Sequence, residues 1–225
     1  MTSDWDDDGG RSFLRGLPVL TGARSVAQLD VEAAPDEPRT LFISWLYEAV
    51  AADVAEPHAM TISTIDPTGR PRARVLILKA VDAAGWHFAI STESQKGLDL
   101  TANPVAALTF YWPSIARQIR VVGPVVDDGA GVSAADFLAR PAGSRAMALT
   151  LRQSEPFFDP GEIDTALQKA RHQLEVDPKL VPHEWKSRAV QPDEVEFWQG
   201  SSDRRHSRIQ YRRVIDGWEK NLLWP

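Results

Sequence analysis

The sequence predicts a mainly β protein of the α+β type, in which antiparallel strands form a barrel and helices lie at its periphery. Stretches with strand character outnumber helical ones, and most follow one another as hairpins. The clearest hairpin covers residues 59–78, because residues 59–65 alternate small or polar with apolar side chains and residues 66–69 supply turn chemistry. Consecutive antiparallel hairpins favour closure into a barrel.

The other strands and the helices follow from the same kinds of pattern. Further strands are expected at residues 86–91, 105–112, 117–126, 194–199, 204–214 and 217–222. Helices are expected where apolar residues recur at helical spacing behind a capping residue. The expected capping residues are Asp36, with Pro38 in the first turn, and Ser94. Ser133 is expected to cap a helix through a capping box completed by Asp136, and Ser144 to cap a helix that reaches residues 153–154. An amphipathic helix is expected at residues 162–176.

Composition limits the domain organisation and the function. Residues 1–35 are polar and weakly periodic, so we expect a mobile N-terminal arm with one short element near residues 12–20, followed by one domain over residues 36–225. A net charge of −6 argues against nucleic-acid and anionic-membrane partners, and the absence of cysteine excludes thiolate metal sites; we expect no metal. No apolar run approaches the roughly 20 residues that cross a bilayer, and the acidic N-terminus does not resemble a signal peptide. A cytoplasmic enzyme or binding protein is the expectation.

The second strand of the hairpin carries an unusual number of cations. Arg72, Arg74 and Lys79 could be solvated side chains of an edge strand, or they could form an anion site. Arg74 and Lys79 differ in parity, so a regular strand would send them to opposite faces. They can serve one pocket only if the strand end re-aims Lys79 or if the pocket wraps around the strand.

A second cationic stretch lies near the C-terminus. If residues 204–211 are extended, alternation places Arg204, His206 and Arg208 on one face, where they repel one another unless an anion lies against them. Trp198 precedes them and offers a ring for stacking. Ser94 and Lys96 at a helix start could also bind phosphate, although serine is an ordinary N-cap.

Several motifs occur in a fixed order over residues 36–225. They are residues 74–79, Ser94-Gln95-Lys96-Gly97, Arg117-Gln118, Arg140-Pro141 with Ser144, Gln153-Ser154, and Glu196-Phe197-Trp198-Gln199-Gly200 followed by Arg204, His206 and Arg208. In this combination the chain resembles the pyridoxamine 5′-phosphate oxidase family of FMN-dependent oxidases. The resemblance implies an antiparallel split β-barrel and a homodimer with FMN at the subunit interface.

The resemblance also implies roles for individual residues. The FMN contacts would be Arg74, Val75, Leu76, Lys79, Lys96, Gln118, Gln153, Ser154, Trp198 and Arg208. The substrate phosphate would meet Lys79, Arg140 and Ser144, and the substrate ring would lie against Arg204 and His206, which are the expected catalytic residues. Both cationic stretches would then surround one cofactor and one small phosphorylated substrate.

Four positions depart from the family pattern. Gln95 replaces an Arg, Asp136 replaces a Tyr that touches the substrate phosphate, residues 185–187 read Trp-Lys-Ser where Trp-Gly-Gly is usual, and residues 14–15 are all that remains of a lid motif. Some departures resemble the flavin oxidases of phenazine biosynthesis, but Lys79 agrees with the vitamer oxidases. For Asp136 the complete capping box favours a local role over contact with the substrate.

We therefore expect an FMN-dependent oxidase that converts pyridoxine or pyridoxamine 5′-phosphate to pyridoxal 5′-phosphate, with O2 as acceptor and H2O2 as product. Two alternatives stay open. One is the same chemistry on another ring, such as a reduced tricyclic carboxylate. The other is a flavin-binding module without turnover.

Overall fold

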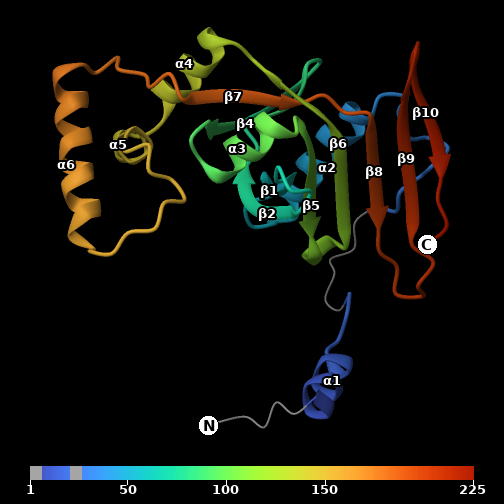
Figure 1. Cartoon of the computed structure of the whole chain (residues 1–225). Helices are drawn as coiled ribbons and strands as arrows, with labels where there is room; N and C mark the ends of the chain where they lie inside the picture. The colour runs from blue at the N-terminus through green and yellow to red at the C-terminus, as the bar shows by residue number, and fades with distance from the viewer. Residues whose placement is uncertain (1–6, 21–26) are drawn as a thin grey trace.

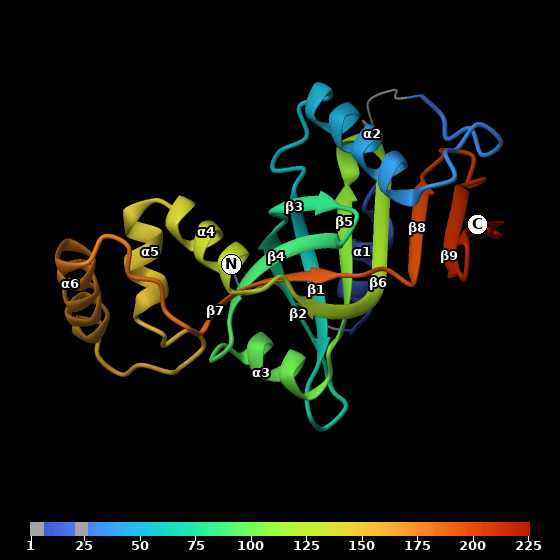
Figure 2. The ribbon, with the colours of Figure 1, turned by 90° about the horizontal axis from the view of Figure 1, so that it is seen from above.

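The computed structural model describes residues 7–20 and 27–225, and it shows one large antiparallel sheet with helices around it (Figures 1 and 2). The helices in these ranges are α1 (Asp7–Gly16), α2 (Pro38–Ala51), α3 (Gln95–Ala102), the 3-10 helix η1 (Pro113–Ile115), α4 (Ala130–Ala139), α5 (Ala142–Leu149) and α6 (Gly161–Val176). The strands are β1 (Ala59–Ile65), β2 (Pro71–Ile77), β3 (Ala80–Asp82), β4 (Gly85–Ser91), β5 (Val105–Trp112), β6 (Arg117–Asp127), β7 (Trp185–Val190), β8 (Glu194–Gln199), β9 (Ser207–Val214) and β10 (Gly217–Leu222). The predicted β-rich antiparallel barrel with peripheral helices is confirmed.

The sheet divides at β6, its longest strand. The first half of β6 pairs with β8 and the second half with β7, so the main path β10-β9-β8-β6-β5-β1-β2 carries a branch through β7, β4 and β3. The two parts curl toward each other as a half-barrel. Helices α4, α5 and α6 extend to one side of the sheet, beyond the end of β7 (Figures 1 and 2).

Helix α2 covers the inner face of the sheet with large aromatic side chains. The Phe42 ring lies 5.5 Å from that of Trp86 and 5.0 Å from that of Phe110, measured between centroids, and Trp45 lies 5.2 Å from Phe197. All five side chains are buried, so they supply much of the apolar area that stabilises the fold. The opposite, outer face of the sheet carries the alternate residues of each strand, such as the exposed Tyr111 on β5.

Strand β2 lies at the end of the main path, and among the described strands it pairs only with β1. One edge of β2 therefore presents backbone N–H and C=O groups that no other described strand uses. This free edge borders the cavity described below.

Three predicted helix starts are wrong. Glu37, not Asp36, precedes α2, and Asp36 instead pairs with Lys220 at 2.9 Å. Helix α4 begins one turn before Ser133, because Gly129 adopts a left-handed φ of 90° that starts the helix earlier. Ser133 therefore lies inside α4, where its hydroxyl donates to the Gly129 carbonyl and accepts from the Ser187 amide.

The helix assigned to a Ser144 cap also differs from expectation. Pro141 occupies the capping position of α5 and Ser144 lies in the first turn. The helix stops at Leu149 and not at residues 153–154, because Leu151 has a positive φ of 55° that a right-handed helix cannot contain.

The last cationic stretch is only partly extended. Strand β9 begins at Ser207, and the residues before it form a turn in which Arg204 has a φ of 67° and its amide bonds the Ser201 carbonyl. The prediction that Arg204, His206 and Arg208 alternate onto one face of a strand is therefore wrong. Strands β3 and β7 were not expected from the sequence.

Residues 27–35 are held against the barrel. The Gln199 side chain accepts from the Leu29 amide at 2.7 Å and donates to the Ala27 carbonyl at 3.1 Å, and the Tyr211 hydroxyl donates to the Pro35 carbonyl. The element predicted near residues 12–20 is represented by α1, and residues 1–6 and 21–26 of the expected arm lie outside the described residues. None of the described helices is both long and apolar enough to span a membrane.

Candidate functional site

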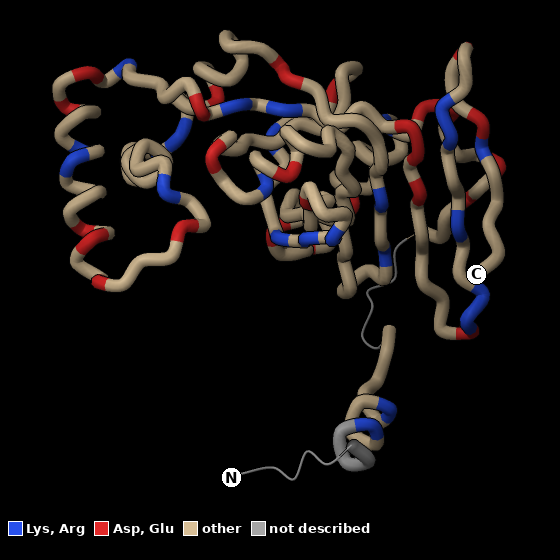
Figure 3. Tube along the Cα trace, in the orientation of Figure 1, with Lys and Arg blue, Asp and Glu red and all other residues tan. Residues whose placement is uncertain are grey.

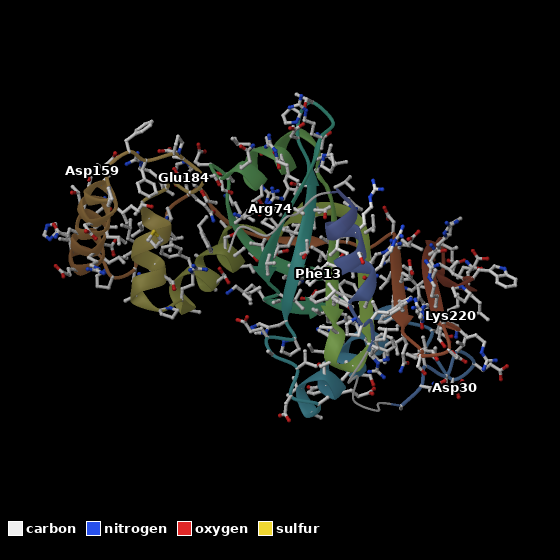
Figure 4. All side chains as sticks on the ribbon, turned by 90° about the horizontal axis from the view of Figure 1, so that it is seen from below. Phe13, Asp30, Arg74, Asp159, Glu184 and Lys220 are labelled. Carbon is white, nitrogen blue, oxygen red and sulfur yellow. The ribbon has the colours of Figure 1, made fainter. Side chains whose placement is uncertain are left out.

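Two arginines of β2 are held in place by the buried Asp99 of α3. Register with β1 turns Arg72 and Arg74 toward the inner side of the sheet, where a cation needs a partner. Arg72 lies 3.0 Å and Arg74 lies 3.5 Å from the Asp99 carboxylate, and Arg74 also donates to the Thr64 hydroxyl. Arg74 therefore has a fixed place between β2 and α3 (Figure 4).

Lys96 lies in the first turn of α3 and is only 6% exposed. Its ammonium donates to Gln153 at 2.9 Å and contacts the Ser94 hydroxyl, and no carboxylate pairs with it among the described residues. Burial, and then the positive charge of Arg74, lower the pKa of Lys96 to about 8. A buried cation at a helix N-terminus that lacks a carboxylate partner is suited to bind an anion.

Glycine is required at the next position of this turn. A Cβ at Gly97 would collide with the backbone carbonyl oxygens of Ser91 and Thr92 at the end of β4. The side-chain oxygen of Ser94 accepts from the Gly97 amide, as predicted for an N-cap. The start of α3 is thus pressed against β4, which fixes the position of Lys96.

A cavity of about 610 Å³ opens beside Lys96 and the free edge of β2. Seven of the predicted site residues line it: Val75, Leu76, Lys79, Lys96, Arg140, Ser144 and Gln153. Val75 and Leu76 are neighbours that point to opposite faces of β2, so the cavity runs around the strand edge. This explains how residues of different parity, including Lys79 just beyond the strand, reach one site.

The end of the cavity near α4 and α5 combines two cations with one carboxylate. The Arg140 guanidinium lies 4.4 Å from the centre of the Trp185 ring, and its buried Nε has no hydrogen-bond partner among the described residues. One Asp136 oxygen accepts from Trp185 Nε1 at 2.8 Å, and the other lies 4.0 Å from Lys79 Nζ. The predicted capping role of Asp136 is therefore wrong. Burial lowers the pKa of Arg140, while the nearby Asp136 charge opposes that shift.

A second group of predicted residues lies on the outer face of the sheet. Gln118 on β6, Trp198 on β8 and Arg208 on β9 are directly paired across three neighbouring strands, so their side chains form one row. None of them lines the 610 Å³ cavity. The cations of β6 and β9 are also drawn well apart from those near α5 in Figure 3.

Arg208 is engaged by a nearly buried carboxylate. Glu196 accepts from Arg208 Nε at 2.9 Å and from Arg120 Nη2 at 2.6 Å, and the Glu196 side chain is 4% exposed. The charge of Arg208, the one cation of this row, is therefore partly neutralised by Glu196. This pairing could not be read from alternation within one strand.

Arg204 and His206 lie in the turn between β8 and β9. His206 Nδ1 accepts from the Ser201 amide at 3.0 Å, and its ring lies 5.0 Å from that of Trp198. Both residues are near the outer row and do not line the cavity. Ser154, exposed and with a φ of 77°, also lies outside the lining, whereas its neighbour Gln153 contributes to it.

Three residues of the site had no role in the sequence-based prediction. Asp99 forms ion pairs with the β2 arginines, the Trp185 ring packs against the Arg140 guanidinium, and Arg152 lines the cavity. Arg152 adjoins the Gln153-Ser154 motif, so its sequence position could have suggested it. Trp185 opens the Trp-Lys-Ser motif, which also pointed to it, whereas nothing local in the sequence marks Asp99, because its partners lie far away along the chain.

Comparison with known proteins relates this geometry to a family. Residues 46–179 match the family model described as pyridoxamine 5′-phosphate oxidase, and residues 185–225 match the pyridoxine 5′-phosphate oxidase C-terminal dimerisation region. The chain belongs to the pyridoxamine 5′-phosphate oxidase family. It is thus a flavin-dependent oxidoreductase, as the motifs predicted.

Individual members of the pyridoxamine 5′-phosphate oxidase family match along most of the chain. The pyridoxine/pyridoxamine 5′-phosphate oxidase of Pseudomonas syringae pv. syringae is 39% identical over 194 residues, which is 85% of this chain and 90% of the relative. The enzyme of the same name from Paraburkholderia phytofirmans is 39% identical over 214 residues, covering 94% of this chain and 100% of the relative.

Solved structures support the same split-barrel fold. PhzG from Burkholderia lata 383, in complex with tetrahydrophenazine-1-carboxylic acid, has a TM-score of 0.84 at 30% identity and covers 91% of this chain and 100% of its own. A pyridoxamine 5′-phosphate oxidase-related, FMN-binding protein from Nostoc punctiforme has a TM-score of 0.68 at 17% identity, covering 90% of this chain and 100% of its own. The second similarity concerns the fold alone.

Proposed function

We propose that this protein is an FMN-dependent oxidase that converts pyridoxine or pyridoxamine 5′-phosphate to pyridoxal 5′-phosphate, with O2 as acceptor and H2O2 as product. The observation that carries the proposal is the cavity beside β2, which gathers seven of the residues expected to hold FMN and a substrate phosphate. The 39% identity to enzymes named for this reaction supports the same substrate.

The chemistry of the donors fits FMN. The Lys96 ammonium is desolvated and has no carboxylate partner in the part of the chain that the structure describes, so a phosphate would supply the missing anion. Arg74 does not line the cavity, but its positive charge lowers the pKa of Lys96, and we assign both cations to the FMN phosphate. The free edge of β2 offers backbone groups to the polar rim of a flavin ring, and Val75 and Leu76 offer apolar contact.

The chain's own residues would bind and orient the reactants. FMN, when bound, supplies the two-electron redox chemistry. Arg140 and Ser144 would hold the substrate's phosphate, with Lys79 between the two ligands. Arg204 and His206 would lie against the substrate ring. Because His206 Nδ1 accepts a hydrogen bond from the Ser201 amide, a neutral His206 carries its proton on Nε2.

We propose that the complete site needs two copies of the chain. Gln118, Trp198 and Arg208 lie on the outer sheet face, away from the cavity, and the C-terminal match is to a dimerisation region. A partner whose outer face covers the cavity would bring these residues to FMN. This arrangement gives a homodimer with FMN at the subunit interface.

A second substrate class is favoured by one observation. Asp136 places a carboxylate beside Lys79, where an extra negative charge disfavours a phosphate. The PhzG structure holds a ring carboxylate on a closely similar fold. A reduced ring carboxylate is therefore the alternative substrate for the same chemistry.

Aerobic peroxide release from the FMN-loaded protein tests the proposal. We expect the protein to turn yellow with FMN and to release peroxide with pyridoxine or pyridoxamine 5′-phosphate. Peroxide release only with reduced ring carboxylates would favour the alternative. FMN binding without turnover of any amine or alcohol would indicate a flavin-binding module, and a protein that ignores millimolar FMN would reject all three readings.

A further inference from the structure

Asp136 stands where the family resemblance places a Tyr that touches the substrate phosphate, but it does not itself line the cavity. It lies behind the cavity wall, and the three residues around it, Lys79, Arg140 and Trp185, all line the cavity. Its side chain is 15% exposed. Asp136 can therefore act on a ligand only through these neighbours.

Each carboxylate oxygen of Asp136 faces a different neighbour. Oδ2 accepts from Trp185 Nε1 at 2.8 Å, which fixes the indole ring. The Arg140 guanidinium lies over that ring at 4.4 Å, one helical turn after Asp136 on α4. Oδ1 lies 4.0 Å from the Lys79 ammonium. One carboxylate thus orients both cations at this end of the cavity.

Charge at this end follows from the same contacts. Lys79 and Arg140 supply two positive charges and Asp136 supplies one negative charge, so the three together carry one net positive charge. Among the described residues, the cavity lining contains no Asp or Glu, and its other cations are Lys96, which we assign to FMN, and Arg152, which pairs with Glu155 and Glu162. A ligand group with a single negative charge matches this net charge, whereas a second negative charge would find no further cation among these three residues.

We propose that Asp136 is a positioning residue that selects the charge of the substrate's acidic group, so that the site binds a singly charged group, either a ring carboxylate or the singly protonated phosphate of a vitamer, more tightly than a doubly charged phosphate. The inference rests on the proposed function, because it assumes that the substrate's acidic group binds beside Arg140. A ring carboxylate and a singly protonated phosphate ester share the required charge, and the experiment separates them.

Two substitutions separate the charge of Asp136 from its hydrogen bond. Asp136→Asn keeps an oxygen that accepts from Trp185 but removes the negative charge, whereas Asp136→Ala removes both. Asp216→Asn is the matched control, since it removes an exposed carboxylate in the β9–β10 turn, well away from α4 (Figure 1). All four proteins are compared with FMN bound.

Calorimetric titration with two inert probes provides the readout. The first is 4-deoxypyridoxine 5′-phosphate at pH 8, where its phosphate is doubly charged and it has no group to oxidise. The second is phenazine-1-carboxylate, which carries one charge. We expect Asp136→Asn to tighten binding of the phosphate probe about tenfold and to change carboxylate binding less than threefold. Repeating the phosphate titration at pH 5, where the ester is singly charged, should remove most of the difference between wild type and Asp136→Asn.

Asp136→Ala should weaken the binding of both probes, and the tryptophan emission of the protein, to which Trp185 is one of eight contributors, should shift as that ring loses its acceptor. Unchanged or weaker phosphate binding in Asp136→Asn would overturn the inference, as would an equal effect of Asp216→Asn or a failure of wild type to bind either probe. The proposed reaction is tested separately. If Asp136→Asn binds the phosphate probe about tenfold more tightly but neither vitamer phosphate yields peroxide, the vitamer substrate is rejected and charge selection by Asp136 is retained. The converse result, turnover of the vitamers with the same KM in wild type and Asp136→Asn, would reject charge selection alone.

Discussion

At the scale of single residues, Lys96 is a buried cation whose surroundings disfavour its charge. It is buried with its pKa lowered to about 8, so the charged form costs stability below that pH. The difference from an ordinary lysine corresponds to an upper limit of about 3 kcal/mol. A buried lysine that lowers the free energy of unfolding in this way is expected to bind a ligand.

Lys96→Met should therefore stabilise the FMN-free protein while weakening FMN binding. We expect the free energy of unfolding at pH 7 to rise by about 1–3 kcal/mol, and FMN affinity to fall roughly 10- to 150-fold, the usual range for a lost charge-assisted contact. Denaturant unfolding and flavin fluorescence titration measure the two effects. Lys169→Met on the exposed part of α6 is the control and should change neither. A variant that loses stability and keeps FMN would contradict the assignment of Lys96.

The same residue predicts how FMN affinity depends on pH. Above about pH 8 the FMN-free protein loses the Lys96 proton, and binding a phosphate must then restore it. The Kd for FMN should rise by up to about tenfold per pH unit above that point. Titrations between pH 7 and 9.5 measure the slope, and Lys96→Met should show a nearly flat profile. Parallel slopes in both proteins would assign the pH dependence to another group.

Arg208 is predicted to serve FMN and to balance Glu196. Arg208→Ala would leave the nearly buried Glu196 with Arg120 as its remaining close cation. We expect weaker FMN binding together with a loss of about 1–3 kcal/mol of stability. Arg212→Ala, on the same strand but 60% exposed, should change both by less than about 0.5 kcal/mol. Arg204→Ala should instead lower turnover and leave FMN bound.

The residues show what the sequence could and could not predict about the site. Motif order identified the cavity lining, including Lys96 and Arg140, because those positions carry the chemistry itself. Arg117 belongs to the same motifs but is a buried structural residue, paired with Glu48 at 3.0 Å and stacked on Trp45. Asp136 was misassigned because a capping box describes local contacts, whereas its real partners are 49 and 57 residues away.

At the scale of elements, His87 joins the end of β3 to the segment that precedes α4. Its ring bonds Asp82 at the end of β3 and Asp128 just before α4, each at 2.8 Å, and Ser187 on β7 donates to the same Asp128 oxygen. Burial lowers the pKa of His87, but the two carboxylates outweigh burial and raise it overall. Both ring nitrogens can donate only when the imidazole is protonated.

The His87 contacts should make stability depend on pH. Because the folded pKa is raised, the contribution is complete below the unfolded value of about 6.5 and is lost as pH rises through the folded value. Wild type should exceed His87→Asn in unfolding free energy by about 1–2 kcal/mol at pH 6 and by less at pH 9. His172→Asn on α6, which is 77% exposed, is the control. A gap that widens with pH would refute the role of the protonated ring.

Most elements could be predicted because their patterns are local. Strands β1, β5, β8 and β10 match their predicted bounds, since alternation and turn residues define them. The misplaced boundaries are those where backbone geometry overrides pattern, as at Gly129 before α4 and Arg204 before β9. Strand β7 escaped prediction because its residues follow a helix and turn without a clear alternation.

At the scale of the whole molecule, the exposed outer face of the sheet predicts assembly. Val75 is 65% exposed and Tyr111 is 55% exposed on this face, in the same sheet as the row that ends at Arg208. Large apolar side chains on a sheet face favour burial by a partner. The match of residues 185–225 to a dimerisation region supports the same conclusion.

Tyr111→Asp should disrupt the dimer and FMN binding together, because the proposed site uses both subunits. Light scattering should return about twice the chain mass of 24.9 kDa for wild type and a value near that mass for the variant. Val176→Asp is the control, because Val176 is 74% exposed at the end of α6, and this variant should remain dimeric. A wild-type monomer that binds FMN normally would contradict the two-chain site.

The free edge of β2 has a consequence for the chain before it acquires FMN. An unpaired strand edge is a template on which another copy can add a strand, and such pairing leads to aggregates. Pro71, Arg72 and Arg74 lie on β2 and oppose it, because proline lacks the required N–H and like charges repel when two such edges meet. The arginine assigned to the cofactor would thus also protect newly made chains. Overproduction under riboflavin shortage should therefore yield more insoluble protein, and Arg74→Leu should aggravate it even where flavin is plentiful.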